Sequence, residues 1–341
     1  MANRSTPSRS FNTLRHSNRE DRIKRDRQGR IALLAMTVIA IAIVLTLAIF
    51  LICSAVDHFG SIAPPTPDDN DTSTENNGAV GGEITYASIT KASSDIHAGV
   101  LLIVNKSTEY VFPSSTSNLV VIDSNRLKYE GIYNTYLPTG YNWKLDKTAL
   151  DAFNQMMYKF YELEGDGSVK ISSAYRSYED QANSSTSSTP AGFSDHHTGY
   201  CLSLRTGSGG YLDVDAHWIY LNSHKYGYVV RYPDDKSDIT GVSGYEYCFR
   251  YVGVPHATYM SANDLCLEEY VSLLATDYAG EEHLQIKGAD GNDYEVYYVA
   301  AAATDLTTIK VPSNYEYTLS GDNMGGFIVT VNLDAPRASA E

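Results

Sequence analysis

The sequence predicts an α+β protein in which helices surround a central antiparallel sheet. Segments 148–163 and 264–275 carry apolar residues at helical spacing. Short strand-like runs lie between and after these segments, without the regular strand–helix alternation of a doubly wound sheet. One long apolar run precedes this mixed region. We therefore predict a basic tail, a transmembrane helix, a linker, a mixed domain and a small β-rich appendage, which occupy residues 1–30, 31–53, 54–91, 92–277 and 278–341.

Residues 31–53 form an uncharged run rich in Ile, Leu, Ala and Val. A helix of this length spans about 34 Å, which is enough to cross a hydrocarbon core of about 30 Å. The preceding residues 1–30 contain nine Arg or Lys against three Asp or Glu, and such a basic flank stays in the cytoplasm. A cleaved signal peptide is the alternative, but its apolar stretch normally covers about 7–15 residues. We predict a single-pass cell-membrane protein with a cytoplasmic N-terminus and an extracytoplasmic C-terminal domain.

The formal net charge of the chain is −15 although its first 30 residues are basic, so the rest is strongly acidic. Such a surface repels phosphates, which excludes nucleic acid as a partner. Residues 64–83 are rich in Pro, Asp, Asn, Thr and Gly and contain almost nothing apolar. This composition predicts a flexible, solvated linker between membrane and domain.

The periodicity of short apolar runs predicts the strands of the globular part. Residues 323–326 are typical of a hairpin turn before the last strand. Asp264 is placed to cap the second helix. The predicted strands are 99–105, 169–173, 226–231, 249–252, 294–300, 308–311 and 327–331.

Four segments in order and register resemble the VanY-type zinc D-alanyl-D-alanine carboxypeptidase family, an M15B-like group of cell-wall peptidases. The segments are SAYRS at 173–177 with Gln181, GFSDHHTG at 192–199, KYGY at 225–228 continuing to RYP at 231–233 and TG at 240–241, and FRYVG at 249–253 followed by His256. The resemblance implies a zinc ion held by a His and an Asp from S-x-H-x-x-G-x-A-x-D and by a second His from E-x-W-H. It also implies that the Glu of E-x-W-H is the general base for the zinc-bound water.

This sequence departs from that pattern at most of the chemical positions. His196 falls on the first ligand, whereas the Asp position is Ser203, the second His is Cys248 and the base is Tyr245. A hydroxyl is a poor zinc ligand, and a tyrosine with a pKa near 10 is a poor base. The resemblance therefore implies a vestigial metal site and no cofactor. The alternative is an altered zinc site that recruits Glu246.

Three other positions match residues that face the substrate peptide in the family, namely Arg176, Gln181 and Ser194. Arg176 can clamp a carboxylate with two hydrogen bonds, or it can simply order the end of its strand. Asp213, Asp215 and His217 resemble a metal cluster when taken alone, but their spacing favours solvated loop residues.

Cys201 and Cys248 both fall at positions around the former metal site. In an oxidising compartment they can form a disulfide across it, or they can remain two small buried thiols. Cys53 and Cys266 show no pairing pattern.

Together these features predict a membrane-anchored, VanY-like envelope protein that has lost zinc hydrolysis and binds a peptidoglycan stem peptide or an envelope partner. One alternative is an active D,D-carboxypeptidase with altered ligands. Another is a structural assembly protein whose interface is formed by residues 278–335.

Overall fold

The computed structural model describes residues 83–185, 189–214 and 217–337. The predicted tail and transmembrane helix, residues 1–53, lie outside these ranges, so the membrane anchor stays a prediction. No helix within the described ranges has the length and apolar character needed to span a bilayer. The described residues belong to one compact unit.

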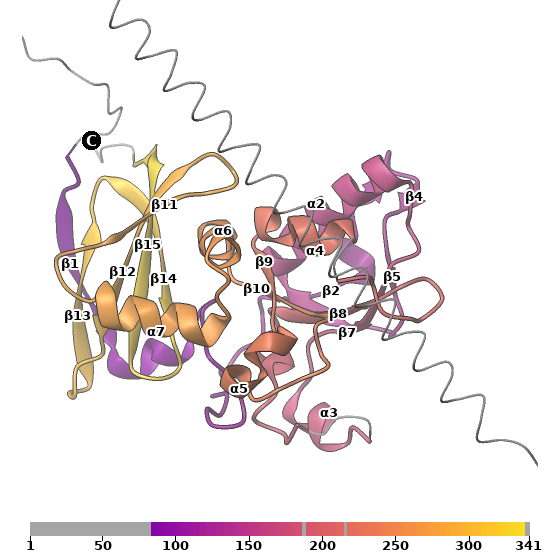
Figure 1. The fold of residues 1–341 in the computed structure, drawn as a ribbon. Coiled ribbons are helices and arrows are strands. Elements are labelled where there is room, and N and C mark those ends of the chain that lie inside the picture. The colour runs from indigo at the N-terminus through magenta and orange to yellow at the C-terminus, as the bar shows by residue number, and fades with distance from the viewer. Residues whose placement is uncertain (1–82, 186–188, 215–216, 338–341) are drawn as a thin grey trace, which may run out of the picture. The chain divides into compact units, whose positions relative to one another are not determined.

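A five-stranded sheet forms the centre of the N-terminal part (Figure 1). Only β5 and β7 run parallel, and the other neighbouring pairs are antiparallel. This arrangement confirms the predicted α+β class and the central antiparallel sheet. In spatial order the strands are β5 (Leu137–Pro138), β7 (Lys170–Ser173), β8 (Cys201–Arg205), β10 (Cys248–Tyr251) and β9 (Tyr228–Val230).

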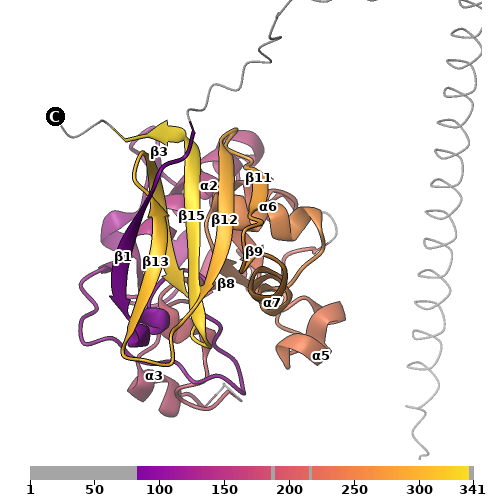
Figure 2. The ribbon, with the colours of Figure 1, turned by 90° about the vertical axis from the view of Figure 1, so that its left-hand side faces the viewer.

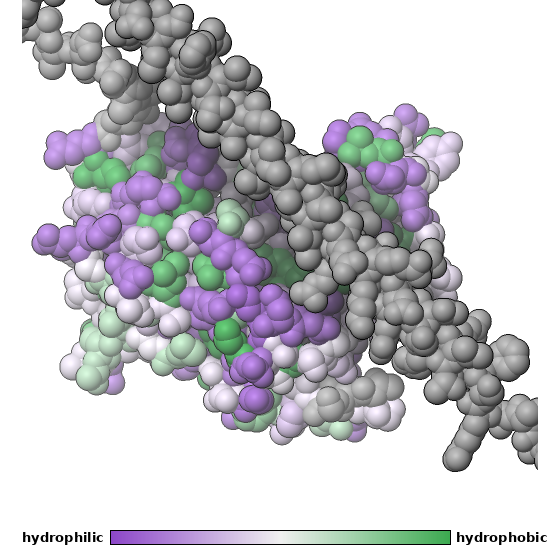
Figure 3. Space-filling model, viewed as in Figure 1, coloured by the Kyte–Doolittle hydropathy of each residue, from purple (hydrophilic) through white to green (hydrophobic). Residues whose placement is uncertain are grey.

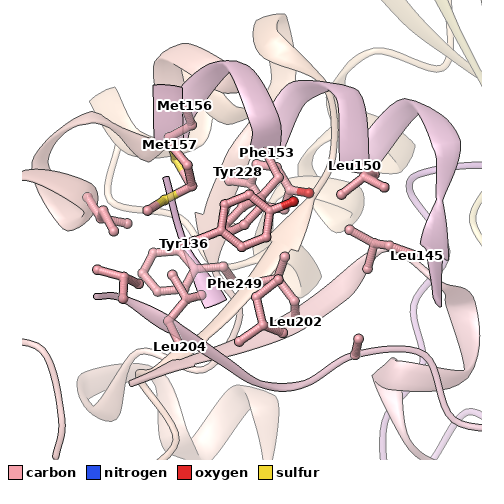
Figure 4. Close-up of a cluster of buried hydrophobic side chains, with 14 of the residues drawn as sticks. Tyr136, Leu145, Leu150, Phe153, Met156, Met157, Leu202, Leu204, Tyr228 and Phe249 are labelled. Atoms are coloured by element: carbon pink, nitrogen blue, oxygen red, sulfur yellow. The ribbon is translucent and has the colours of Figure 1, made fainter. Parts of the chain in front are cut away.

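Helix α2 (Lys147–Glu164) covers one face of this sheet, as its periodicity predicts. Asp146 caps the helix by accepting hydrogen bonds from the backbone N–H groups of Thr148 and Ala149, and Gly165 ends it in the left-handed conformation. Figure 4 shows side chains of the helix, including those of Phe153 and Met157, facing side chains of the sheet. The sheet contributes Leu202, Leu204, Tyr228 and Phe249 to this core.

Successive side chains of a strand point to opposite faces of the sheet, so a second set of side chains lies on the face away from this core. Leu202 pairs with Phe249 on the core side, so their neighbours point the other way. Across β8 and β10, Ser203 pairs with Cys248 and Cys201 pairs with Arg250. The residues at the predicted metal positions therefore lie on the face away from α2.

The C-terminal part is built mainly from strands, as predicted. Four strands form a sheet in the order β11 (Leu284–Lys287), β12 (Asp293–Ala300), β15 (Gly326–Pro336) and β14 (Tyr315–Gly321). Beside it, β13 (Leu306–Pro312) pairs with β1 (Tyr86–Ala92) near the start of the described chain (Figure 2). The sequence predicts residues 86–91 as part of the linker, and this is wrong. They form a strand because Ile89 packs on the apolar cluster around Val311 and Phe327.

Helices α6 (Val254–Ala262) and α7 (Leu267–Asp277) pack against the four-stranded sheet through a second apolar cluster (Figure 1). The predicted helix at 264–275 is confirmed, but Asp264 does not cap it. Asp264 has a φ of 53° in the preceding turn, and Cys266 is the N-cap in a reciprocal capping box with Glu269.

The predicted strand at 99–105 is wrong, although the burial that suggested it is right. Residues 101–104 are at most 2% exposed but belong to no sheet. Side chains satisfy much of their backbone instead, since the Leu101 N–H donates to the Ser320 hydroxyl. Arg250 donates to the carbonyls of Val100 and Leu102. An apolar run alone cannot distinguish a strand from a segment held in this way.

A buried ion network supplies those arginine contacts. Arg250 Nη1 lies 2.5 Å from Asp195 Oδ1, and Arg231 Nε lies 3.4 Å from the same oxygen. Arg231 also donates to both carboxylate oxygens of Glu268, at 2.8 and 2.9 Å, and to the carbonyl of Val104. Burial alone would raise the pKa of Asp195, but the two guanidiniums lower it below its ordinary value.

The remaining elements are short. On the face shown in Figure 3, hydrophilic side chains are interspersed with smaller hydrophobic areas, as expected for an acidic, solvated surface. The short elements are the paired strands β2 (Leu119–Val121) and β6 (Lys144–Asp146), the pair β3 (Lys128–Tyr129) and β4 (Tyr133–Asn134), helices α3 (Tyr178–Ala182), α4 (Trp218–Asn222) and α5 (Ser237–Thr240), and the 3₁₀ helices η1 (Ser93–His97), η2 (Asp123–Asn125), η3 (Asp195–Thr198), η4 (Ser223–Tyr226) and η5 (Asp234–Lys236).

Replacing Arg250 should destabilise the protein severely. We expect Arg250→Met to lower the free energy of unfolding by about 3–5 kcal/mol, because it removes one partner of a buried charge. Arg337→Met is the matched control, since Arg337 pairs with Glu316 at the surface and such pairs contribute at most about 1 kcal/mol. Urea denaturation of both variants measures the difference. Equal losses would contradict a structural role for the network.

His256 should make stability depend on pH. Its ring joins Tyr270 of α7 to Thr330 of β15, and burial lowers its pKa to about 3. An unfolded histidine has a pKa near 6.5, so between these values the unfolded state binds more protons. The unfolding free energy should therefore fall as pH drops from about 6.5 towards 3, by up to ~1.4 kcal/mol per pH unit from this residue.

The variant His256→Gln isolates this contribution, because it removes the titrating group. Urea denaturation between pH 4 and 7 should show a shallower pH slope for the variant than for the native protein. Parallel slopes would show that His256 is not held neutral in the folded state.

Candidate functional site

The site begins with His196, which η3 places over the polar face of the five-stranded sheet. Nδ1 of His196 lies 3.2 Å from the carbonyl oxygen of Cys201, so this nitrogen donates and Nε2 is left as the acceptor. Nε2 lies 3.4 Å from the hydroxyl of Ser203. The structure thus brings together three residues that the motif register assigned to one metal site, His196, Ser203 and Cys248.

The spacing of these side chains does not fit the family's zinc ion. Ser203 Oγ lies 3.0 Å from Cys248 Sγ, and the two side chains hydrogen-bond to each other. Oxygen and sulfur ligands of one tetrahedral zinc ion would stand about 3.6 Å apart. Within the described ranges, no group of three His, Cys, Asp or Glu side chains is arranged to hold a metal ion. Glu246 accepts a hydrogen bond from the backbone of Asp234 instead of joining His196.

The two cysteines of the site are free thiols. Cys201 faces Arg250 and Cys248 faces Ser203, so the two cysteines are diagonal neighbours on adjacent strands rather than direct partners. The two thiols are nevertheless close enough to hydrogen-bond to each other. Burial raises the pKa of the Cys201 thiol, whereas hydrogen bonding from Cys201 lowers the pKa of Cys248. The interpretation as two buried thiols therefore describes the structure, and the predicted disulfide does not.

Tyr245, at the family's general-base position, lies in the turn before β10. Its carbonyl accepts a hydrogen bond from the Cys248 N–H, and its ring packs against Tyr247 with centroids 5.3 Å apart. The guanidinium of Arg205 lies 3.8 Å from the rings of both Tyr247 and Tyr211. Tyr245 is thus the end of an aromatic cluster stabilised by Arg205.

Arg176 and Gln181 lie together beside this group. Nη1 of Arg176 lies 3.0 Å from Gln181 Oε1, and Nη2 lies 2.8 Å from the hydroxyl of Ser173. Ser173 pairs with Ser203 across β7 and β8, so the guanidinium stands one strand away from His196 and Cys248. Capping of α3 is done by Ser177. If Arg176 orders the end of β7, it does so through its hydrogen bonds to Ser173 and Gln181 and not by capping α3.

Ser194, the third residue predicted to face a peptide, is buried and precedes η3 as its N-cap residue. The neighbouring His197 points away from His196, as expected from sequence. Its Nδ1 donates to the carbonyl of Arg176 and its Nε2 accepts from the Gly192 N–H, so it fixes the loop. His217 caps α4, in agreement with its interpretation as a loop residue.

Sequence reasoning missed the ion network behind the site. Asp195, adjacent to His196, contacts Arg250, and Arg250 follows Phe249 in an otherwise apolar strand. A charged residue inside such a strand is a signal that sequence does provide, because a buried charge needs a partner. The identity of that partner depends on tertiary structure.

Comparison with known proteins agrees with this architecture. The model of the VanY D-alanyl-D-alanine carboxypeptidase family matches residues 142–254. A D-alanyl-D-alanine carboxypeptidase of Enterococcus faecium is 32% identical over 250 residues, which cover 71% of this chain and 78% of that protein. The putative carboxypeptidase YodJ of Bacillus subtilis is 30% identical over 50% of this chain and 66% of its own length.

Among solved structures, the vancomycin-resistance D,D-dipeptidase VanXYg in complex with a D-Ala-D-Ala phosphinate analogue matches with a TM-score of 0.60 and 26% identity. The match covers 73% of this chain and 99% of that one. The chain belongs to the VanY family of D-alanyl-D-alanine carboxypeptidases. The similarity extends well beyond residues 142–254. The VanXYg structure and the Enterococcus faecium relative each match more than two thirds of this chain.

Proposed function

We propose that this protein is a catalytically degenerate VanY-family domain that binds peptidoglycan stem peptides at the outer face of the membrane. One observation carries the proposal. Arg176 and Gln181 hydrogen-bond to each other near His196. Ser203 and Cys248 hydrogen-bond to each other at positions where the family motif has zinc ligands.

Arg176 has the donors that a peptide carboxylate requires. Its contacts to Ser173 and Gln181 use two of the five N–H donors of a guanidinium, so three remain for a ligand. The residue is partly exposed, and Gln181 beneath it is buried, which limits its rotation. A guanidinium that donates two parallel hydrogen bonds binds a carboxylate strongly and fixes its orientation. The bound analogue in VanXYg supports a D-alanyl peptide as the ligand class.

The loss of hydrolysis follows from chemistry at three positions. Ser203 and Cys248 stand where the motif has an aspartate and a histidine ligand, and the two side chains hydrogen-bond to each other. Tyr245 replaces the glutamate that would accept a proton from bound water, and a phenol is too weak a base at neutral pH. With neither a metal nor a base, the domain retains the capacity to bind but not to cleave.

The location rests on sequence. The apolar run 31–53 has the length of a membrane span, and the basic residues before it favour a cytoplasmic N-terminus. A linker of the polar residues 64–83 supports a folded domain outside the membrane, where stem peptides are found.

Metal analysis and a peptide assay test the proposal together. The purified protein, equilibrated with zinc and then dialysed, should hold no stoichiometric zinc by elemental mass spectrometry. A stem peptide ending in D-Ala-D-Ala should bind in calorimetry without release of D-alanine. Stoichiometric zinc with D-alanine release would show instead that the protein is an active carboxypeptidase with an altered site.

Arg176→Ala should weaken binding of that peptide about 10- to 100-fold, because a charge-assisted hydrogen bond contributes about 1.5–3 kcal/mol. A peptide with an amidated C-terminus should lose a similar amount with the native protein. Arg337→Ala is the control, since Arg337 contacts Glu316 and Tyr317 on the C-terminal strands. Binding that is insensitive to both amidation and Arg176→Ala would refute carboxylate recognition.

A further inference from the structure

A cavity of about 220 Å³ lies next to the site but outside it. One wall comes from residues 97–119 and the other from the loop around η3 together with Tyr175. Tyr175 and His197 line the cavity, whereas the adjacent Arg176 and His196 belong to the site described above. The complete lining is His97, Ala98, Gly99, Leu102, Tyr110, Phe112, Pro113, Ser115, Thr116, Asn118, Leu119, Tyr175, His197, Thr198 and Tyr200.

The cavity lining contains no carboxylate, ammonium or guanidinium side chain. None of the described residues around the cavity is Lys, Arg, Asp or Glu. Burial lowers the pKa of His197, and both of its ring nitrogens are already engaged, so it offers only a neutral ring face. A charged ligand would lose its hydration here without gaining a counter-charge.

Aromatic rings make up part of the cavity lining. Phe112 lies with its ring centroid 4.9 Å from those of both Tyr110 and His197. Phe112 is 37% exposed, and Tyr178, 6.1 Å from it, is 48% exposed. These faces suit a ligand with a flat apolar side that packs on aromatic rings.

Hydroxyl groups provide the polar side. Tyr110 is only 8% exposed, yet its hydroxyl makes no hydrogen bond to another residue in the described part of the chain. This oxygen is not one of the buried polar atoms that lack a partner, so it is open to solvent and available to a ligand. Ser115, Thr116 and Asn118 add further uncharged donors and acceptors to the lining.

We propose that this cavity binds one ring of an uncharged carbohydrate. A sugar ring presents a C–H face to aromatic side chains and hydroxyls to Tyr110 and its polar neighbours. A purely apolar ligand would leave the Tyr110 hydroxyl without a partner, and the volume is below the ~300 Å³ usual for drug-sized ligands. This site is separate from the peptide carboxylate site, so a polymer carrying both sugars and peptides could occupy the two at once.

The test uses a peptide-free, uncharged oligosaccharide of N-acetylglucosamine, titrated calorimetrically into the native protein and its variants. Tyr110→Phe removes only the hydroxyl and should weaken binding about two- to tenfold, the change expected for one neutral hydrogen bond. Phe112→Ala should weaken it further. Tyr211→Phe is the control, because Tyr211 is an exposed tyrosine outside the cavity, and it should leave binding unchanged.

Absence of saccharide binding at millimolar concentration would overturn the proposal, and so would binding that Tyr110→Phe and Phe112→Ala leave intact. Displacement of the saccharide by a D-Ala-D-Ala peptide in the Arg176→Ala variant would assign the cavity to peptide instead. Saccharide binding that survives Arg176→Ala while peptide binding is lost supports two independent sites. Arg176-dependent peptide binding without saccharide binding refutes only the carbohydrate site, and the converse result refutes only the proposed peptide function.

Discussion

Asp195 is held between two fully buried arginines, and the surroundings of the site are assembled around this interaction. Arg250 comes from β10, Arg231 follows β9, and Glu268 on α7 completes the network. The same guanidiniums hold the carbonyls of residues 100, 102 and 104, which would otherwise be buried in a segment without sheet partners. The next residue after Asp195 is His196. The network thus links the peptidase-like core, the segment before it and helix α7.

Protein contacts alone hold His196, Ser203 and Cys248 in place. In a domain that depends on a structural metal, loss of the ligands would remove folding free energy. Here the position of His196 is set by η3, by the Cys201 carbonyl and by its neighbour Asp195, none of which requires an ion. Ser203 and Cys248 satisfy each other by a hydrogen bond. Arg176 is likewise fixed by protein partners, Ser173 and Gln181.

Sequence patterns predicted the elements whose signal is local. The periodicity of α2 and the short runs of β7, β9, β10, β12, β13 and β15 were sufficient, and motif register brought His196, Ser203 and Cys248 together correctly. Residues 99–105 were misassigned because burial was visible in the sequence but the arginine partners of the backbone were not. β1 was missed because its partner β13 lies more than 200 residues away. The ion network could not be predicted either, because Asp195, Arg231, Arg250 and Glu268 are far apart in the sequence.

We propose that the chain keeps the fold of its family and that Ser203, Cys248 and Tyr245 account for the proposed loss of hydrolysis. The most direct measurement rebuilds those positions with Ser203→Asp, Cys248→His and Tyr245→Glu in one protein, then records zinc content and D-alanine release from a D-Ala-D-Ala peptide. We expect the folded triple variant to bind one zinc ion and to release D-alanine, whereas the native protein should do neither. A folded triple variant without zinc or activity, or a native protein that already has both, would contradict it.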